Sequence, residues 1–202
     1  MRATGRVKRH RFVARIIGIS GSLRRESFNT SLLRAAVDVV PPGSTIEIGS
    51  IREIPLYDGD VEATQGIPPP VQALKDLIAS GDGLLIVTPE YNNSTPGVLK
   101  NAIDWLSRPP ADSARVFRGR PVAIIGATPG LGGTRLSQAA LLPVLRTLGT
   151  LPWFEGRLEV SSAAKVFDKD GRIVDDAIRV RLETLVKGFT HFADAVKTTL
   201  RA

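Results

Sequence analysis

The pattern of apolar and polar residues along this chain predicts strands that alternate with helices. A short, continuous apolar run predicts a strand that is buried on both faces of a sheet. A longer segment with apolar residues three and four positions apart predicts an amphipathic helix. By these criteria the strands cover residues 14–20, 45–51, 83–88, 120–127 and 151–160, and the helices cover 29–40, 69–80, 96–106, 135–148 and 175–200.

The order of these elements predicts an α/β fold with a five-stranded parallel sheet and helices on both faces. The third strand carries the apolar run Leu84-Leu85-Ile86-Val87, which places it at the sheet centre. In such a sheet ligands bind at the carboxyl edge of the strands, near the point where the strand order reverses. Three loops are expected at that edge: 20–29, 89–95 and 128–134.

The first of these loops links the first strand to the first helix and is rich in hydroxyl groups. A helix N-terminus has unpaired N–H groups and a partial positive charge. Polar side chains and one fixed cation gather there: Ser20, Ser22, Arg24, Ser27, Asn29 and Thr30. This composition suits a phosphate monoester, and an ordinary helix cap is the alternative. The glycine spacing matches neither the P-loop nor the dinucleotide fingerprint.

The other two loops each allow a functional and a purely structural interpretation. Pro89-Glu90-Tyr91-Asn92 has a stiff backbone and an aromatic ring, which suit the edge of a planar heterocycle; the alternative is a turn before the helix at Pro96. The segment Thr128–Thr134 is rich in glycine, so its backbone can approach a ligand closely; the alternative is a flexible connection.

Together, the motifs of these loops resemble the NAD(P)H-dependent FMN reductase family, and most closely its quinone and chromate reductase branch. The resemblance covers residue 14 to the C-terminus. Its motifs are Gly-Ser-Leu-Arg-x-x-Ser-x-Asn at 21–29, Thr-Pro-Glu-Tyr-Asn at 88–92, Leu-Lys-Asn-Ala-Ile-Asp-Trp at 99–105 and Gly-x-Gly-Gly at 130–133.

The resemblance implies a flavodoxin-like fold, bound FMN and a homodimer or homotetramer. It assigns the FMN phosphate to the first loop, through Ser20, Ser22, Arg24, Ser27, Asn29 and Thr30. It assigns the isoalloxazine to Pro89, Glu90, Tyr91 and Asn92, and its other side to Thr128, Gly130, Gly132 and Gly133. The implied reaction is hydride transfer from NADPH or NADH, through FMN, to a small-molecule acceptor such as a quinone, an azo dye or chromate. It follows ping-pong order and needs no catalytic side chain.

A non-enzymatic, flavodoxin-type electron carrier is the alternative function. Such carriers are usually strongly acidic, whereas this domain is almost neutral. Six of the basic residues that give the chain its net charge of +7 lie in residues 1–15, which hold no acidic residue. We therefore predict a basic, disordered arm over residues 1–13 and a single domain over 14–202. Nucleic-acid or anionic-lipid binding by the arm is the less favoured interpretation.

Composition excludes several other classes. The chain has no cysteine and only two histidines, which argues against thiolate catalysis, disulfides and a metal site. No apolar run approaches the length of about 18 residues needed to span a bilayer, and no secretory signal is recognisable, so a cytoplasmic, non-membrane protein is expected.

The helix at 96–106 predicts contact with another subunit, because its apolar residues occupy more of the circumference than one buried stripe requires. The alternative is that this helix is deeply buried within one chain.

Overall fold

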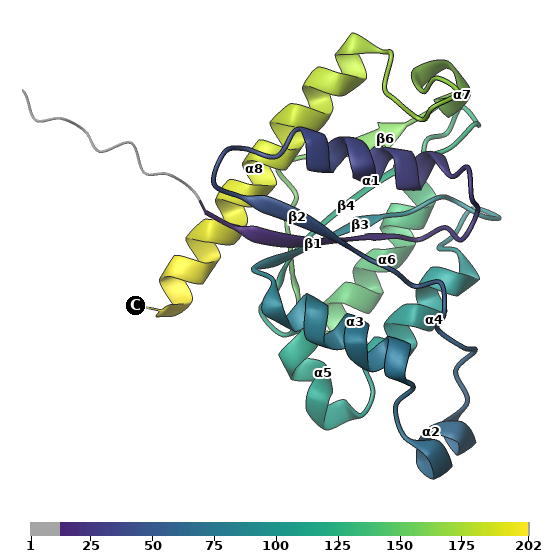
Figure 1. Cartoon of the computed structure of the whole chain (residues 1–202), viewed down its shortest axis with the longest axis vertical. Helices are drawn as coiled ribbons and strands as arrows, with labels where there is room; N and C mark the ends of the chain where they lie inside the picture. Colours follow the sequence, from purple (N-terminus) through teal and green to yellow (C-terminus); the bar gives the residue numbers. More distant parts are fainter. Residues whose placement is uncertain (1–12, 202) are drawn as a thin grey trace, which may run out of the picture.

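The computed structural model describes residues 13–201, which form a sheet between two layers of helices (Figure 1). All strand pairs within the sheet are parallel, in the order β2-β1-β3-β4-β5, and β6 also pairs with β4. The strands are β1 (Arg15–Ser20), β2 (Thr45–Gly49), β3 (Gly83–Val87), β4 (Pro121–Ala127), β5 (Leu151–Pro152) and β6 (Leu158–Val160). The predicted α/β fold is confirmed. The predicted basic arm lies, apart from Val13, outside the described residues.

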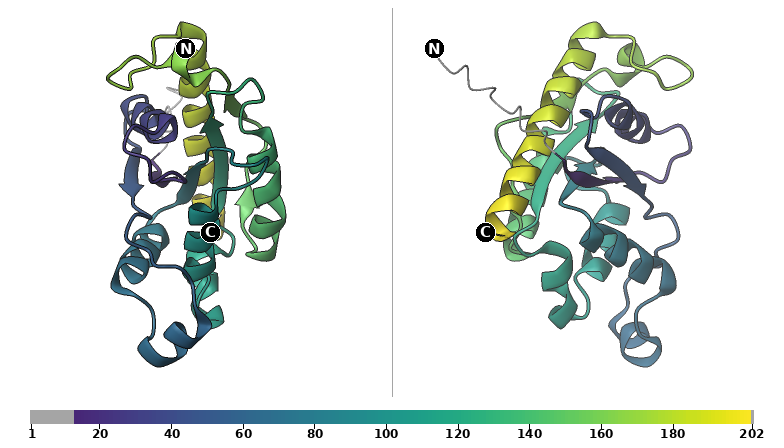
Figure 2. Two further views of the ribbon diagram at one scale, coloured as in Figure 1. Left: turned by 90° about the vertical axis from the view of Figure 1, so that its right-hand side faces the viewer. Right: turned by 60° about the vertical axis from the view of Figure 1, so that its left-hand side comes forward.

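The helices cover both faces of the sheet, as predicted. They are α1 (Phe28–Asp38), α2 (Gly59–Gln65), α3 (Pro69–Ser80), α4 (Gly97–Leu106), α5 (Pro110–Phe117), α6 (Arg135–Thr147), α7 (Ala163–Val166) and α8 (Asp176–Arg201). One apolar cluster joins α1 and α8 to one face, and a second joins α3, α4, α5 and α6 to the other (Figure 2). Every residue of the central strand β3 is buried, as its apolar run predicts.

The predicted fifth strand at 151–160 is two short strands, which corrects the sequence interpretation. The chain leaves the sheet at Trp153, whose indole is buried against Phe189 with ring centroids 5.8 Å apart. Two glycines make room for it, because a Cβ at Gly156 or Gly188 would lie 2.6 or 2.8 Å from the indole. The Trp153 N–H still donates to the Val122 carbonyl at 2.8 Å, so the pairing with β4 ends just after this residue and resumes at β6.

Three helices, α2, α5 and the four-residue α7, fill segments in which the sequence patterns predict no helix. Helix α2 lies between the predicted strand 45–51 and the predicted helix 69–80, and its first turn is capped by the Asp58 side chain, which accepts from Asp60 N–H. Helix α5 begins at Pro110, the second of two consecutive prolines. Helix α2 carries no buried residue, so it has no apolar stripe to reveal it in the sequence.

Helix α4 is buried within the one chain, which corrects the argument for a second subunit at this helix. Its apolar residues are in the core: Leu99, Ala102, Ile103, Trp105 and Leu106. The remaining apolar side chain of the helix, Val98, is partly exposed. The breadth of the apolar surface on α4 reflects its position between neighbouring elements of the same fold.

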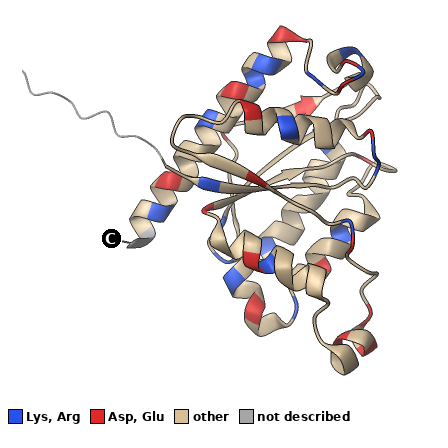
Figure 3. Ribbon diagram, viewed as in Figure 1, with Lys and Arg blue, Asp and Glu red and all other residues tan. Residues whose placement is uncertain are grey.

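Charged side chains of both signs are interspersed over the described helices (Figure 3). Within residues 13–201, none of the helices combines the length and the apolar character that a bilayer crossing requires.

Candidate functional site

The three predicted loops meet at the carboxyl edge of the sheet, where they enclose a pocket of about 310 Å³. Its walls come from the loops after β1, β3 and β4, which are neighbouring strands in the order β1-β3-β4. The lining residues are Ser22, Arg24, Ser27, Phe28, Asn29, Pro89, Glu90, Tyr91, Ala127, Thr128 and Pro129. Eight of these were predicted from the sequence. The structure places the other predicted residues outside the lining: Ser20, Thr30, Asn92, Gly130, Gly132 and Gly133.

The first loop is organised by its own hydroxyl groups. Ser27 caps α1, because its Oγ accepts from the backbone N–H groups of Asn29 and Thr30 at 3.2 and 3.4 Å. The hydroxyls of Ser20 and Thr30 bond to each other at 3.0 Å. The cap interpretation is therefore confirmed for Ser27. The phosphate site stays a prediction, with Ser22 and Arg24 in the lining of the pocket.

Arg24 brings a cation to the pocket with most of its donors available. One guanidinium nitrogen donates to the Glu26 carbonyl, and the guanidinium carbon lies 5.3 Å from the centroid of the Phe28 ring. Because a guanidinium has five N–H donors, one such bond leaves capacity for an anion. The described lining thus combines a cation and hydroxyl groups with proline rings, Phe28 and Tyr91.

Asn29 connects the start of α1 to the end of β4. Its Nδ2 donates to the Ala127 carbonyl at 2.8 Å, and its Oδ1 accepts from Ala127 N–H at 2.9 Å. The Asn29 side chain is buried, and it has a second N–H that remains able to donate to a ligand. Asn29 therefore sets the position of the third loop relative to the first.

The second loop makes a tight turn beside the pocket. Tyr91 and Ser94 bond to each other through both backbone groups, and the two residues between them, Asn92 and Asn93, have φ angles of 51° and 60°. Asparagine adopts this left-handed conformation more readily than most residues. The turn leaves Tyr91 half-exposed at the pocket wall and moves Asn92 to the turn tip.

The glycine-rich third loop is attached at several points. Thr128 N–H donates to the Val160 carbonyl at 2.9 Å, and Ser162 N–H donates to the Gly130 carbonyl at 2.9 Å. Gly133 has a φ of 66°, which favours glycine. Thr128 and Pro129 are the residues of this loop that reach the described lining, so its glycines shape the loop rather than the pocket wall.

Sequence reasoning missed the buried polar residues behind the pocket. Thr88, Thr134 and Ser137 are fully buried at the junction of β3, β4 and α6. Gly126 lies against them, because a Cβ at this position would be 2.1 Å from the Thr88 carbonyl oxygen and 2.3 Å from Thr134 Oγ1. The sequence shows a threonine at each end of the glycine-rich loop, Thr128 and Thr134. It does not show that Thr134 lies beside Thr88 and Ser137, because that contact exists only in the folded chain.

The segment before α2 packs on α4 rather than into the pocket. Trp105 Nε1 donates to the Pro55 carbonyl at 3.0 Å, and the Tyr57 ring meets the indole edge-on at 4.9 Å. Arg108 hydrogen-bonds Glu62 and lowers the pKa of that carboxyl, while the hydrogen bond from Tyr57 to Glu62 raises the tyrosine pKa. Trp105 is thus a packing residue.

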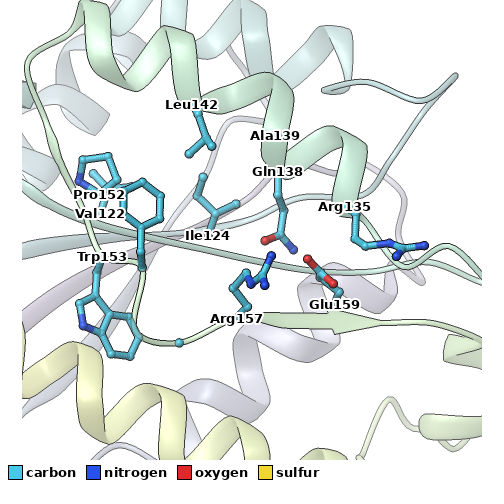
Figure 4. A pocket seen from close by; sticks show the side chains of 12 residues that line it. Val122, Ile124, Arg135, Gln138, Ala139, Leu142, Pro152, Trp153, Arg157 and Glu159 are labelled. Atoms are coloured by element: carbon cyan, nitrogen blue, oxygen red, sulfur yellow. The ribbon is translucent and has the colours of Figure 1, made fainter.

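A second pocket, of about 160 Å³, lies between α6 and the chain that follows β5 (Figure 4). Its walls are apolar where Ile124 and Leu142 face each other, and polar where Gln138, Arg157 and Glu159 lie close together. Gln138 itself is engaged, because its Nε2 donates to Thr134 Oγ1 at 3.0 Å. Among the described residues, no group of three or more His, Cys, Asp or Glu gathers in a way that would hold a metal ion.

Comparison with known proteins gives the same family. Residues 14–165 match the family model described as NADPH-dependent FMN reductase. The chain is 47% identical over 165 residues to an NAD(P)H-dependent FMN reductase of Pseudomonas aeruginosa, covering 82% of this chain and 87% of that protein. It is 40% identical over 172 residues to a 2-hydroxy-1,4-benzoquinone reductase of a Burkholderia species, covering 85% and 92%. Among solved structures, it resembles a flavoenzyme NAD(P)H:acceptor oxidoreductase of Paracoccus denitrificans with a TM-score of 0.81 and 32% identity, covering 91% and 98%.

Proposed function

This chain belongs to the NADPH-dependent FMN reductase family, and on that premise we propose that it reduces quinones with electrons from NADPH or NADH. It is an FMN-dependent oxidoreductase with a flavodoxin-like fold. The observation that carries the proposal is the pocket where the loops after β1, β3 and β4 meet. The Burkholderia relative, named as a benzoquinone reductase, supports a quinone as the acceptor.

The lining of this pocket fits FMN. Ser22 and Arg24 supply a hydroxyl and a guanidinium, which are suitable donors for a phosphate monoester. Pro89, Tyr91 and Pro129 supply apolar surface for a planar ring system. When bound, FMN supplies the two-electron redox chemistry that links nicotinamide oxidation to acceptor reduction.

In this proposal the residues of the protein bind FMN and orient it and the two substrates. Arg24 neutralises the phosphate charge, while Ser27 and Asn29 keep the start of α1 and the end of β4 in place. Tyr91 is half-exposed at the pocket wall, where it shapes the entrance for the nicotinamide and then for the acceptor. We propose that both substrates use this one entrance in turn, which gives ping-pong kinetics, and that azo dyes and chromate are further acceptors.

The test is spectroscopic and kinetic. The purified protein is expected to carry FMN, to bleach on anaerobic addition of NADPH or NADH, and to regain its colour when benzoquinone is added. Steady-state rates at several quinone concentrations are expected to give parallel double-reciprocal lines. A flavin-loaded protein that neither nicotinamide bleaches would overturn the enzyme assignment and favour the electron carrier.

We also propose that the enzyme is a homodimer or homotetramer. Exposed apolar side chains support a contact around α6 and the segment after β5: Leu131, Leu136, Leu142, Leu151 and Phe154. Light scattering of the wild type and of Phe154→Glu tests this, because a charge in a subunit contact is expected to lower the molar mass. A monomeric wild type contradicts it.

The domain limits are likewise a proposal. Residues 14–202 are a single cytoplasmic domain, and residues 1–13 are a basic arm that FMN binding does not need. Strand β1 begins at Arg15, so deletion of residues 1–13 leaves every strand in place. Flavin content and turnover are expected to be unchanged after this deletion, and a loss of either would assign the arm a role in the domain.

A further inference from the structure

The carboxylate of Glu90 lies at the N-terminus of α6, although Glu90 belongs to the loop after β3. Its Oε2 accepts from the backbone N–H groups of Leu136 at 2.8 Å and Ser137 at 3.1 Å. The first N–H groups of a helix have no partner within the helix. Thr134, at the N-cap position of α6, makes no side-chain cap bond. Glu90 therefore supplies the cap from a distant part of the chain.

Two further contacts join the same loop to the same helical turn. Thr88 Oγ1 and Ser137 Oγ are 3.0 Å apart, and both side chains are fully buried. Thr95 Oγ1 donates to the Ser137 carbonyl at 3.3 Å. The loop from Thr88 to Thr95 is thus attached to α6 at its beginning, at Glu90 and at its end.

These attachments relate two walls of the pocket. Glu90 and its neighbour Tyr91 line one wall, while Thr128 and Pro129 line another and lead through the glycine-rich loop into α6. Gly126 packs directly against the Thr88 carbonyl and Thr134, so the two loops also approach closely behind the pocket. The α6 cap thus joins the loop of one wall to the helix that follows the loop of the other.

We propose that Glu90 is a positioning residue that fixes the width of the pocket through the α6 cap. This inference deepens the proposed function and rests on it. The carboxylate accepts two backbone N–H groups that have no partner within the helix. FMN affinity depends on Glu90 because the cap holds Pro89 and Tyr91 opposite Thr128 and Pro129.

Substitutions of Glu90 can separate the effect of its hydrogen bonds from the effect of its charge. A single oxygen, Oε2, accepts both N–H groups, so the amide oxygen of glutamine is able to accept the same pair. Glu90→Gln is therefore expected to preserve the cap, while Glu90→Ala removes it. Glu90→Asp shortens the side chain by one methylene and is expected to weaken both bonds.

The experiment measures FMN affinity by fluorescence titration of the flavin-free protein. We expect Glu90→Ala to weaken FMN binding about tenfold or more, the effect of losing hydrogen bonds to a charged acceptor. Glu90→Gln is expected to stay within about threefold of the wild type, and Glu90→Asp to fall between them. Asp58→Ala is the matched control, because it removes the cap of α2 without touching the pocket.

Hydrogen exchange of the flavin-free protein provides a readout independent of FMN. Glu90→Ala is expected to speed exchange in the first turn of α6 and in residues 88–95 together, and Glu90→Gln to restore slow exchange in both. If Glu90→Ala fails to fold, the Asp variant decides the question by the same two measurements.

The outcomes separate the two proposals. A wild type that binds no FMN refutes the proposed function. A wild type that binds FMN, with Ala and Asp variants of unchanged affinity, refutes the positioning role alone. A Gln variant as weak as the Ala variant also refutes it, because the effect would then follow from the charge of Glu90 rather than from the cap.

Discussion

The side chain of Asn29 pairs with both backbone groups of Ala127, a residue 98 positions further along the chain. This contact joins the helix start that follows β1 to the end of β4. Strand β3 lies between β1 and β4 in the sheet, and the loop after it forms the third wall of the pocket. The contact between Asn29 and Ala127 therefore connects the two outer walls. Asn29 therefore holds α1 and β4 together as well as lining the pocket.

Replacing Asn29 by alanine is expected to destabilise the flavin-free protein by about 1–3 kcal/mol, the cost of leaving buried backbone groups unpaired. The measurement is urea unfolding without FMN. Ser22→Ala is the control, because among the described residues the Ser22 hydroxyl accepts one local hydrogen bond, from Arg24 N–H in its own loop at 3.3 Å. An Asn29→Ala protein as stable as the wild type would show that these two bonds contribute little.

Phosphate recognition predicts a ranking of flavins. Riboflavin lacks the phosphate that Ser22 and Arg24 are proposed to hold, so it is expected to bind far more weakly than FMN. Arg24→Gln should weaken FMN binding by about 1–3 kcal/mol and leave riboflavin binding nearly unchanged. Competitive titration of the flavin-free protein measures both. Equal affinity of the wild type for the two flavins would exclude a phosphate site in this loop.

The sequence predicted the pocket walls because the carboxyl-edge rule depends only on the order of strands and helices. Pro89, Tyr91 and Thr128 lie in the lining for that reason. It did not predict the partners of individual side chains. Glu90 reaches α6 and Asn29 reaches Ala127 through contacts that no local spacing encodes.

In the fold, too, the local sequence pattern predicts some features, while others depend on contacts between distant residues. The limits of α3 match the predicted 69–80, since its apolar stripe is regular and prolines begin it. The break between β5 and β6 coincides with burial of the Trp153 indole in space left by Gly156 and Gly188, a contact that the sequence pattern does not encode.

Gly126 is expected to be irreplaceable at the junction behind the pocket. A Cβ there would overlap the Thr88 carbonyl, which is backbone and has little freedom to move. Gly126→Ala should therefore destabilise the protein by about 1–3 kcal/mol or more, as overpacking does. Gly97→Ala is the control, because a Cβ at Gly97 meets nothing within 4 Å and alanine favours a helix. Thermal unfolding of both variants is the measurement, and a Gly126→Ala protein as stable as the Gly97→Ala protein contradicts the prediction.

A buried lysine links α3 to the start of α5. Lys75 is fully buried, and its Nζ lies 2.5 Å from both Asp112 Oδ2 and the Arg108 carbonyl oxygen. Asp112 also pairs with Arg115, with Nε and Oδ1 2.7 Å apart. At pH 7 we expect Asp112→Asn to cost about 3–5 kcal/mol, because it leaves a buried ammonium facing a neutral amide. Lys75→Met should cost less, because Asp112 keeps Arg115. Urea unfolding ranks the two, and the reverse order would contradict this reasoning.

The same cluster predicts how stability changes with acid. The hydrogen bond from Arg115, followed by that from Lys75, lowers the pKa of Asp112 well below its usual value. A carboxyl whose pKa is lowered by folding adds stability above its unfolded pKa of about 3.9 and loses it as the pH falls through the folded value. The wild type is therefore expected to lose stability below about pH 4, while Asp112→Asn, which has no carboxyl at this position, should lose less over the same interval. Unfolding free energies measured from pH 7 down to pH 2 should show the two curves converging, and parallel curves would mean that Asp112 has the same pKa in the folded and unfolded chain.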